Sequence, residues 1–195
     1  MRYKIIDQHG LNFLTFTVVD WLDIFVRKEY KEIIIDSLKY CQEHKGLQIY
    51  AYVIMTSHIH LVVQTTEEHK LSDTIRDFKK YTGNALIKAI KNNKRESRRE
   101  WLMHRFEWNA KQNKGKDRKY KFWQTGNHPI ALYSPKVIWQ KINYIHLNPV
   151  VEDIVSKREH YLYSSAKNYA QEEAVLIDVR LMDLFDSTGY IHSGM

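Results

Sequence analysis

The sequence contains very little cysteine, proline or glycine. Cys41 is the only cysteine among 195 residues, which excludes an internal disulfide and zinc modules built from several cysteines. Three prolines and seven glycines leave no linker between domains, and we see no internal repeat. No apolar run reaches the roughly 18 residues of a membrane span, and the first ten residues lack the apolar core of a secretory signal. We therefore expect a cytoplasmic chain without a membrane segment.

Positive charge is in excess and is concentrated in one block. Thirty Lys and Arg residues oppose 23 Asp and Glu residues, a net charge of +7. Between Arg76 and Lys121 there are sixteen basic and five acidic residues, so this block alone carries +11. Such a block is typical of a surface that binds a polyanion. A solvated helical face remains the alternative explanation for a charge run taken alone.

The hydrophobic pattern predicts an α+β fold in a single unit. Apolar and β-branched runs predict three strands, and apolar residues at helical spacing predict three helices between and after them. We expect Gly46 to end the first helix, and Ser72 or Asp73 to cap the second. The strands are expected at 12–19, 47–55 and 58–64, and the helices at 25–44, 71–92 and 96–112.

The order of these elements matches a ferredoxin-like antiparallel sheet with helices packed on it and an extra basic helical insertion. We expect a fourth strand at 122–125 and a helix that opens at Ser134-Pro135 and ends at Pro149. Towards the C-terminus we expect an edge strand at 174–179, a short helix at 180–185 and frayed residues at 186–195.

Two histidines stand in a strongly apolar strand. Side chains alternate along a strand, so His58 and His60 share one face and Ile59 takes the other. Two imidazoles at this spacing can reach one metal ion. The alternative is a pair of histidines with ordinary hydrogen bonds on a sheet surface.

A second group of polar residues lies near the end of the last long predicted helix. Tyr144 and Asn148 are four residues apart and share one face, with Lys141 on the same side. Each also has a simple structural explanation: Tyr144 as a packing tyrosine, Asn148 as a helix cap and His146 as an exposed histidine.

The combination of the HIH strand and YIHLNPV at residues 144–150 resembles the single-tyrosine HUH transposases. Within them it is most similar to the REP-associated tyrosine transposases and their insertion-sequence relatives. Phe122-Trp123-Gln124 before the helix and YLYSS at residues 161–165 after it also match. The resemblance extends from about residue 12 to about residue 169. It implies a catalytic HUH domain over 1–170 and a partly flexible extension over 171–195.

The resemblance also implies a mechanism. Tyr144 would be the nucleophile, and His58, His60 and Asn148 would hold Mg²⁺ or Mn²⁺. Independently of the resemblance, Lys141 is a candidate auxiliary cation because a tyrosine nucleophile needs a nearby cation or base, and His146, between the nucleophile and the ligand, is a second auxiliary candidate. The reaction would cleave and rejoin single-stranded hairpin DNA through a 5′-phosphotyrosine link. The resemblance further suggests a homodimer, associated with the nucleoid when bound to DNA.

The basic block supplies candidate DNA contacts, because positive charge follows a phosphate backbone and aromatic rings stack on unpaired bases. Trp101, Phe106 and Trp108 lie among these cations, although core packing is the alternative for the aromatics. The candidate cations are Arg76, Lys79, Lys80, Arg95, Arg98, Arg99, Arg105, Lys114, Lys116, Arg118 and Lys119.

Two other functions remain open at this point. One is a non-catalytic regulator that binds single-stranded nucleic acid on the same fold. The other is a nickase that cuts without strand transfer. A general metallohydrolase is disfavoured, because such a site needs an Asp or Glu ligand and the sequence has no carboxylate beside His58 or His60.

Overall fold

The computed structural model describes residues 4–112, 118–173 and 175–182. Within these residues, four strands form one antiparallel sheet in the order β2-β3-β1-β4. This order is that of a ferredoxin-like sheet, so the predicted fold class is confirmed. The strands are β1 (Asn12–Thr17), β2 (Leu47–Ile54), β3 (His58–Thr65) and β4 (Ile130–Ala131).

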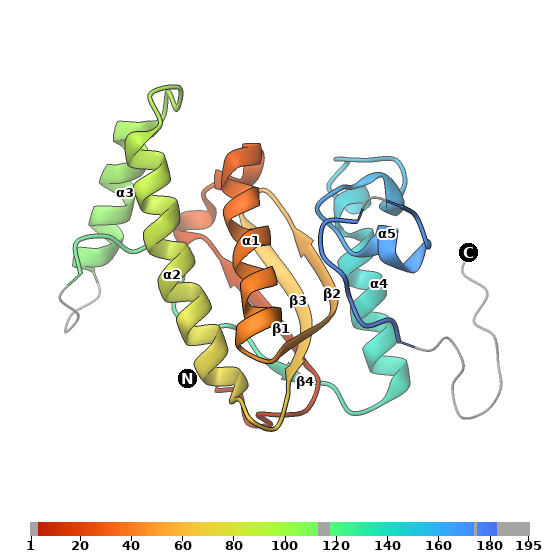
Figure 1. The fold of residues 1–195 in the computed structure, drawn as a ribbon. Coiled ribbons are helices and arrows are strands. Elements are labelled where there is room, and N and C mark those ends of the chain that lie inside the picture. Colours follow the sequence, from red (N-terminus) through yellow and green to blue (C-terminus); the bar gives the residue numbers. More distant parts are fainter. Residues whose placement is uncertain (1–3, 113–117, 174, 183–195) are drawn as a thin grey trace.

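The helices lie on both sides of this sheet. In Figure 1, α1 and α2 lie next to each other in front of the strands, while α4 and α5 lie at the right-hand side. Short 3-10 helices cover Val19–Trp21, Ile24–Val26 and Arg158–His160. None of the helices in the described ranges is both long and apolar enough to cross a membrane. The α-helices are α1 (Lys28–His44), α2 (Leu71–Asn92), α3 (Arg99–Lys111), α4 (Pro135–Val151) and α5 (Ala166–Tyr169).

Strand alternation divides the sheet into two faces. Phe16 of β1 points towards α2, where its ring lies 5.7 Å from that of Phe78. Phe13, three residues earlier on β1, points to the opposite face and stacks on the ring of His60 at 5.3 Å between ring centroids. Ile59, between the two histidines, is fully buried. The predicted alternation of His58, Ile59 and His60 is therefore present.

The limits of several elements differ from the prediction. The first helix starts at Lys28 instead of residue 25, because Ile24–Val26 forms a separate 3-10 turn. Gly46 follows this helix with φ +59, and a Cβ there would collide with the side chain of Thr66. This glycine therefore ends α1 as expected.

The predicted cap of the second helix is wrong. The N-cap of α2 is Lys70, and its side chain makes no capping hydrogen bond. Instead, the backbone amide of Ser72 donates to the side-chain oxygen of Gln8 at 3.0 Å. Gln8, far from α2 in the sequence, thus accepts the amide hydrogen bond that a local N-cap side chain usually accepts.

The last long helix does not end at Pro149. It continues to Val151, and the amide of Glu152 still donates to the carbonyl of Asn148 at 3.1 Å. Proline removes one hydrogen bond from the helix, but the turn after it can form when tertiary packing holds it.

The fourth strand and the C-terminal region also differ from expectation. Trp123 makes a single bridge to Val18 and does not form the predicted strand. The fourth strand is Ile130–Ala131, which pairs with the free edge of β1. Residues 175–182 are neither strand nor helix. They pack on the domain, because Ile177 is buried and the amide of Arg180 donates to the carbonyl of Ile49 at 2.8 Å. The predicted C-terminal elements also include residue 174 and residues 183–195, which lie outside the described residues. The predicted end of the catalytic domain at residue 170 stays a prediction.

The turn between α2 and α3 contains a buried carboxylate. The side chain of Glu96 is 1% exposed and accepts hydrogen bonds from Arg27 at 2.7 Å and from Arg98 at 3.2 Å. Burial opposes its ionisation, but these bonds outweigh burial and lower its pKa. Glu96 therefore ties the start of α1 to the start of α3.

We predict that Glu96→Ala lowers the free energy of unfolding by about 3 kcal/mol, because it leaves two partly buried guanidinium groups without their shared partner. Urea unfolding of the purified protein measures this change. Glu100→Ala is the control, since its side chain is 95% exposed and we expect a change below about 0.5 kcal/mol. Equal losses in the two variants would contradict the structural role of Glu96.

Candidate active site

The two histidines of β3 are held by hydrogen bonds to hydroxyl groups. Nδ1 of His60 lies 2.9 Å from Oγ1 of Thr15, its partner on β1, and Nδ1 of His58 lies 3.2 Å from Oγ of Ser57. The two rings are 4.7 Å apart between centroids. In the tautomer in which Nδ1–H donates to the hydroxyl oxygen, this bond orients the ring and leaves the lone pair of Nε2 available to a metal ion.

Burial keeps both imidazoles neutral at pH 7. It lowers the pKa of His58, although the negative charge of Glu152 acts in the other direction. It also lowers the pKa of His60 to about 3, with further contributions from His58 and from the positive charge of Lys141. Neutral imidazole is the form that binds metal ions.

Helix α4 places a tyrosine and an asparagine opposite these histidines. The hydroxyl of Tyr144 lies 3.5 Å from Nε2 of His60. Tyr144 is 47% exposed, whereas Asn148, one turn later, is 8% exposed. The four residues predicted for the site thus meet in one hollow of about 410 Å³. Its lining residues are Trp21, His58, His60, Tyr144, Leu147, Asn148, Val151 and Glu152.

The two auxiliary residues have different positions. The ammonium nitrogen of Lys141 lies 4.8 Å from the ring centre of Phe13 and 5.7 Å from that of Tyr144. Lys141 therefore puts positive charge beside the tyrosine. His146 lies outside the hollow: it is 3% exposed and its Nε2 is 2.9 Å from Oγ of Ser165. It is neither an exposed histidine nor a member of the hollow.

The sequence does not indicate four of the lining residues as members of the site, among them Trp21 and Glu152. Trp21 follows β1, and no local pattern connects it to the histidines. Glu152 lies one turn beyond Asn148, but the helix was expected to stop at Pro149, so its i, i+4 relation to Asn148 was missed. Its carboxylate corrects the expectation that none lies near the histidines.

The donors in the hollow suit a divalent cation bound by nitrogen and amide oxygen. His58 and His60 present neutral imidazoles on one face, and Asn148 adds an amide. Among the described residues, no three His, Cys, Asp or Glu side chains lie close enough to hold a metal ion together. In the described residues, Glu152 therefore does not complete a carboxylate site with the two histidines.

Lys79 of the basic block points into the protein. Its ammonium group donates to the carbonyls of Gln124 at 3.1 Å and Gly126 at 2.7 Å, and to the side chain of Asn127 at 2.9 Å. Burial and the charges of Lys121 and Arg118 lower its pKa to about 8. Lys79 thus connects α2 to the loop before β4 and does not lie on the surface.

Three of the candidate arginines form ion pairs with carboxylates of the same chain. Arg76 pairs with Asp73 and Asp77, Arg98 with Glu96 and Asp23, and Arg105 with Asp20. Arg99 is half-buried and lies 4.0 Å from Glu100. Lys114 and Lys116 lie outside the described residues. The candidates on the exposed surface are Arg76, Lys80, Arg95, Arg118 and Lys119, of which Arg76 is already paired with Asp73 and Asp77.

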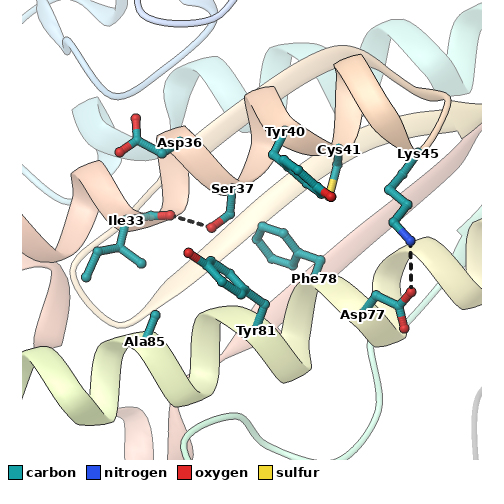
Figure 2. A pocket seen from close by; sticks show the side chains of 10 residues that line it. All are labelled: Ile33, Asp36, Ser37, Tyr40, Cys41, Lys45, Asp77, Phe78, Tyr81 and Ala85. Carbon is teal, nitrogen blue, oxygen red and sulfur yellow. Dashed lines mark hydrogen bonds and ion pairs between the residues drawn. The ribbon is translucent and has the colours of Figure 1, made fainter.

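A second cavity, of about 560 Å³, lies between α1 and α2, on the face of the sheet away from the histidines. Figure 2 shows Tyr40 of α1 and Tyr81 of α2 on opposite sides of this cavity, with Phe78 between them. The ion pair of Lys45 with Asp77, 3.4 Å long, lies at one end. Burial raises the pKa of Cys41 in its wall to about 11, so this thiol is a poor nucleophile. None of the predicted site residues that the structure describes lines this cavity.

A four-stranded antiparallel sheet whose inner strand presents two histidines to a tyrosine and an asparagine on a helix defines the class of single-tyrosine HUH proteins. The chain belongs to the family of IS200-like transposases, because the family model "Transposase IS200 like" matches residues 22–132, more than half of the chain. The match contains His58 and His60 and ends before α4. Tyr144 and Asn148 are therefore placed at the site by the structure and not by this match.

Two of the solved structures that are similar to this chain are described as transposases. A REP-associated tyrosine transposase bound to a REP hairpin is 15% identical, with a TM-score of 0.62, over 97% of this chain and 95% of that one. A protein described as a transposase from Deinococcus radiodurans is 16% identical, with a TM-score of 0.44, over 74% of this chain and 95% of that one. No similar sequence was found among curated proteins. Family membership and the shared fold support a DNA-cleaving transposase.

His146 makes the stability of the domain depend on pH. Burial and then the charge of Arg158 lower its pKa to about 3 in the folded protein, while an unfolded histidine has a pKa near 6.5. Between these values the unfolded chain binds a proton that the folded chain does not bind. Stability therefore falls as the pH falls from about 6.5 towards 3, by up to about 1.4 kcal/mol per unit.

We predict that His146→Gln, which can still bond to Ser165, removes about 2 kcal/mol of the stability difference between pH 7 and pH 5. Urea unfolding at the two pH values measures this difference. His60 titrates in the same direction and remains in the variant, so part of the pH dependence persists. His104→Gln, at an exposed position of α3, is the control. An unchanged pH dependence in His146→Gln would show that its burial does not control protonation.

Proposed function

We propose that this chain is a metal-dependent transposase that cleaves and rejoins single-stranded, hairpin-containing DNA through a covalent bond to Tyr144. The observation that carries the proposal is the 3.5 Å approach of the Tyr144 hydroxyl to Nε2 of His60. A nucleophile candidate on α4 thereby shares one hollow with His58 and Asn148.

The reaction exchanges one phosphodiester for another. The oxygen of Tyr144 attacks a phosphorus atom of the DNA strand, the new O–P bond forms, and the bond from phosphorus to the 3′ oxygen breaks. The leaving oxygen takes a proton and becomes a 3′ hydroxyl. The reverse attack by a 3′ hydroxyl on the phosphotyrosine rejoins DNA without an external energy source. The tyrosine and its 5′ phosphate therefore conserve the energy of the broken bond.

The surroundings of Tyr144 supply a positive charge and access for a DNA strand. Tyrosine hydroxyls are normally protonated at neutral pH, so the nucleophile must lose a proton. The ammonium group of Lys141 lies 5.7 Å from the ring centre of Tyr144, so Lys141 is the proposed auxiliary cation of the reaction. The partial exposure of Tyr144 allows a DNA strand to reach its hydroxyl.

His58, His60 and Asn148 are the proposed ligands of Mg²⁺ or Mn²⁺, of which Mn²⁺ accepts nitrogen ligands more readily. When bound, the cation neutralises charge on the non-bridging phosphate oxygens. Thr15 and Ser57 orient the two imidazoles through their Nδ1 atoms.

Hairpin DNA is the proposed partner, supported by the related transposase that is bound to a REP hairpin. The exposed cations Lys80, Arg95, Arg118 and Lys119 are the proposed contacts to its phosphates, and a homodimer is the proposed assembly.

The first prediction of this proposal concerns the nucleophile. With Mn²⁺ and a labelled pool of single-stranded hairpin DNAs, the protein should retain label on a denaturing gel, and Tyr144→Phe should retain none. Binding on a native gel should change less than about twofold, because only one hydroxyl is removed. Tyr81→Phe, at an exposed position of α2, should still form the adduct.

Each other outcome has a defined meaning. An adduct with Tyr144→Phe would overturn the assignment of the nucleophile. Native complexes without an adduct in the wild-type protein would favour the regulator without catalysis. An adduct that never yields rejoined strands would favour the nickase.

The second prediction concerns the cation. Calorimetric titration with Mn²⁺ should show one site in the wild-type protein. His60→Ala and Asn148→Ala should weaken it at least about tenfold, because each removes a ligand. The DNA adduct should disappear in EDTA and in His60→Ala. His44→Ala, which removes an exposed histidine of α1, should change neither measurement; adduct formation in EDTA would remove the metal from the mechanism.

A further inference from the structure

A tryptophan at the edge of the hollow exposes most of its ring. Trp21 is 60% exposed, although a tryptophan side chain is normally well covered. Its ring lies 5.5 Å from that of His58, at an angle of 72°. It therefore stands directly beside the proposed metal ligands.

Two aliphatic side chains of α4 line the same hollow and are also exposed. Leu147 is 44% exposed and Val151, one turn later, is 76% exposed. Together with Trp21 they form an apolar rim around a polar site. An exposed apolar rim beside a proposed phosphate site suits a flat, weakly polar group attached to that phosphate.

The backbone at Trp21 has an unfavourable conformation. Asp20 and Trp21 both have positive φ values, 55° and 56°, in the left-handed region that bulky residues rarely adopt. Such a conformation persists where the surrounding structure holds it, and it is concentrated at ligand-binding sites.

Helix α3 holds this segment. The carboxylate of Asp20 accepts hydrogen bonds from both Nε and Nη2 of Arg105 and from Asn109 at 2.7 Å. Three residues further on, Asp23 is bonded to Arg98 at 2.6 Å. Residues at the start and in the body of α3 thus hold the segment that contains Trp21.

We propose that Trp21 stacks on an unpaired base of the DNA strand next to the scissile phosphate, with Leu147 and Val151 completing the slot, and that Arg105 positions Trp21 through Asp20. This inference rests on the proposed function for its ligand, a single DNA strand. It assigns the base contact to the loop after β1 and not to the aromatic residues of α3.

The test compares two fluorescein-labelled strands, dT12 and an abasic strand of the same length, by fluorescence anisotropy in EDTA. The dissociation constant of the abasic strand divided by that of dT12 measures the contribution of base contacts. Phosphate contacts cancel in this ratio because both strands have the same backbone. Loss of one stacked base changes affinity by about 5- to 150-fold. We expect Trp21→Ala to lower the ratio at least fivefold and Trp21→Phe to retain most of it.

Two further variants test whether the change in the ratio is specific to Trp21. Tyr40→Ala removes an aromatic side chain that is 55% exposed on α1, on the other face of the sheet, and should leave the ratio unchanged. Trp101→Ala removes an exposed tryptophan of α3 that does not line the hollow. A fall of less than fivefold in Trp21→Ala, or a larger fall in Trp101→Ala than in Trp21→Ala, would overturn the inference.

The role of Arg105 requires a double-mutant cycle. Arg105→Ala should lower the base-to-abasic ratio in the wild-type background and should have no further effect on it in Trp21→Ala. Any direct phosphate contact of Arg105 would instead weaken both strands equally and reduce the salt dependence of binding. An equal fall of the ratio in both backgrounds would show that Arg105 does not act through Trp21.

The stacking proposal and the proposed function fail separately. The anisotropy ratio is measured without metal and without cleavage, whereas the tyrosine chemistry is measured as a covalent adduct. An adduct that depends on Tyr144 together with an unchanged ratio in Trp21→Ala would overturn only the stacking role. A Trp21-dependent ratio without any adduct would overturn only the proposed chemistry.

Discussion

Strand β3 is hydrogen-bonded on both sides, to β1 and to β2, and this double pairing sets the direction of every side chain along it. Ile59 is fully buried against the face that α1 and α2 cover, so His58 and His60 must point to the other face. A slip of one residue would put both histidines into the apolar core and Ile59 at the site. The burial of alternate apolar residues is thus what holds the candidate metal ligands in place.

The orientation of α4 depends on the same sheet. Ile142 and Ile145 are fully buried, and the buried His146 is bonded to Ser165, whose hydroxyl oxygen also accepts from the amide of Tyr52 on β2. These contacts fix one side of α4 against the rest of the protein. Tyr144 and Asn148, one turn apart, lie on the side of α4 that faces the histidines of β3. A histidine suggested as auxiliary therefore positions the helix and has no place in the hollow.

The basic insertion serves two purposes. Arg98 and Arg105 form ion pairs with Asp23 and Asp20, which follow β1 in the chain. The ammonium group of Lys79 donates hydrogen bonds to oxygens of the loop before β4. The two arginines hold the segment that contains Trp21, and Lys79 joins α2 to the loop before β4. Only part of the excess positive charge therefore remains for a polyanion, and the number of basic residues in the block overstates the number of phosphate contacts.

The sequence by itself determined the features that depend on local periodicity. Alternation in the HIH strand, the i, i+4 relation of Tyr144 and Asn148, and the order of strands and helices all follow from the spacing of apolar residues. Only the tertiary structure decided which arginines are paired, that Gln8 serves the start of α2, that the chain continues as a helix through Pro149, and that Trp21 stands beside His58. The reason is physical: Arg105 and Asp20 are 85 residues apart, and no local pattern records a contact that forms only after the chain has folded.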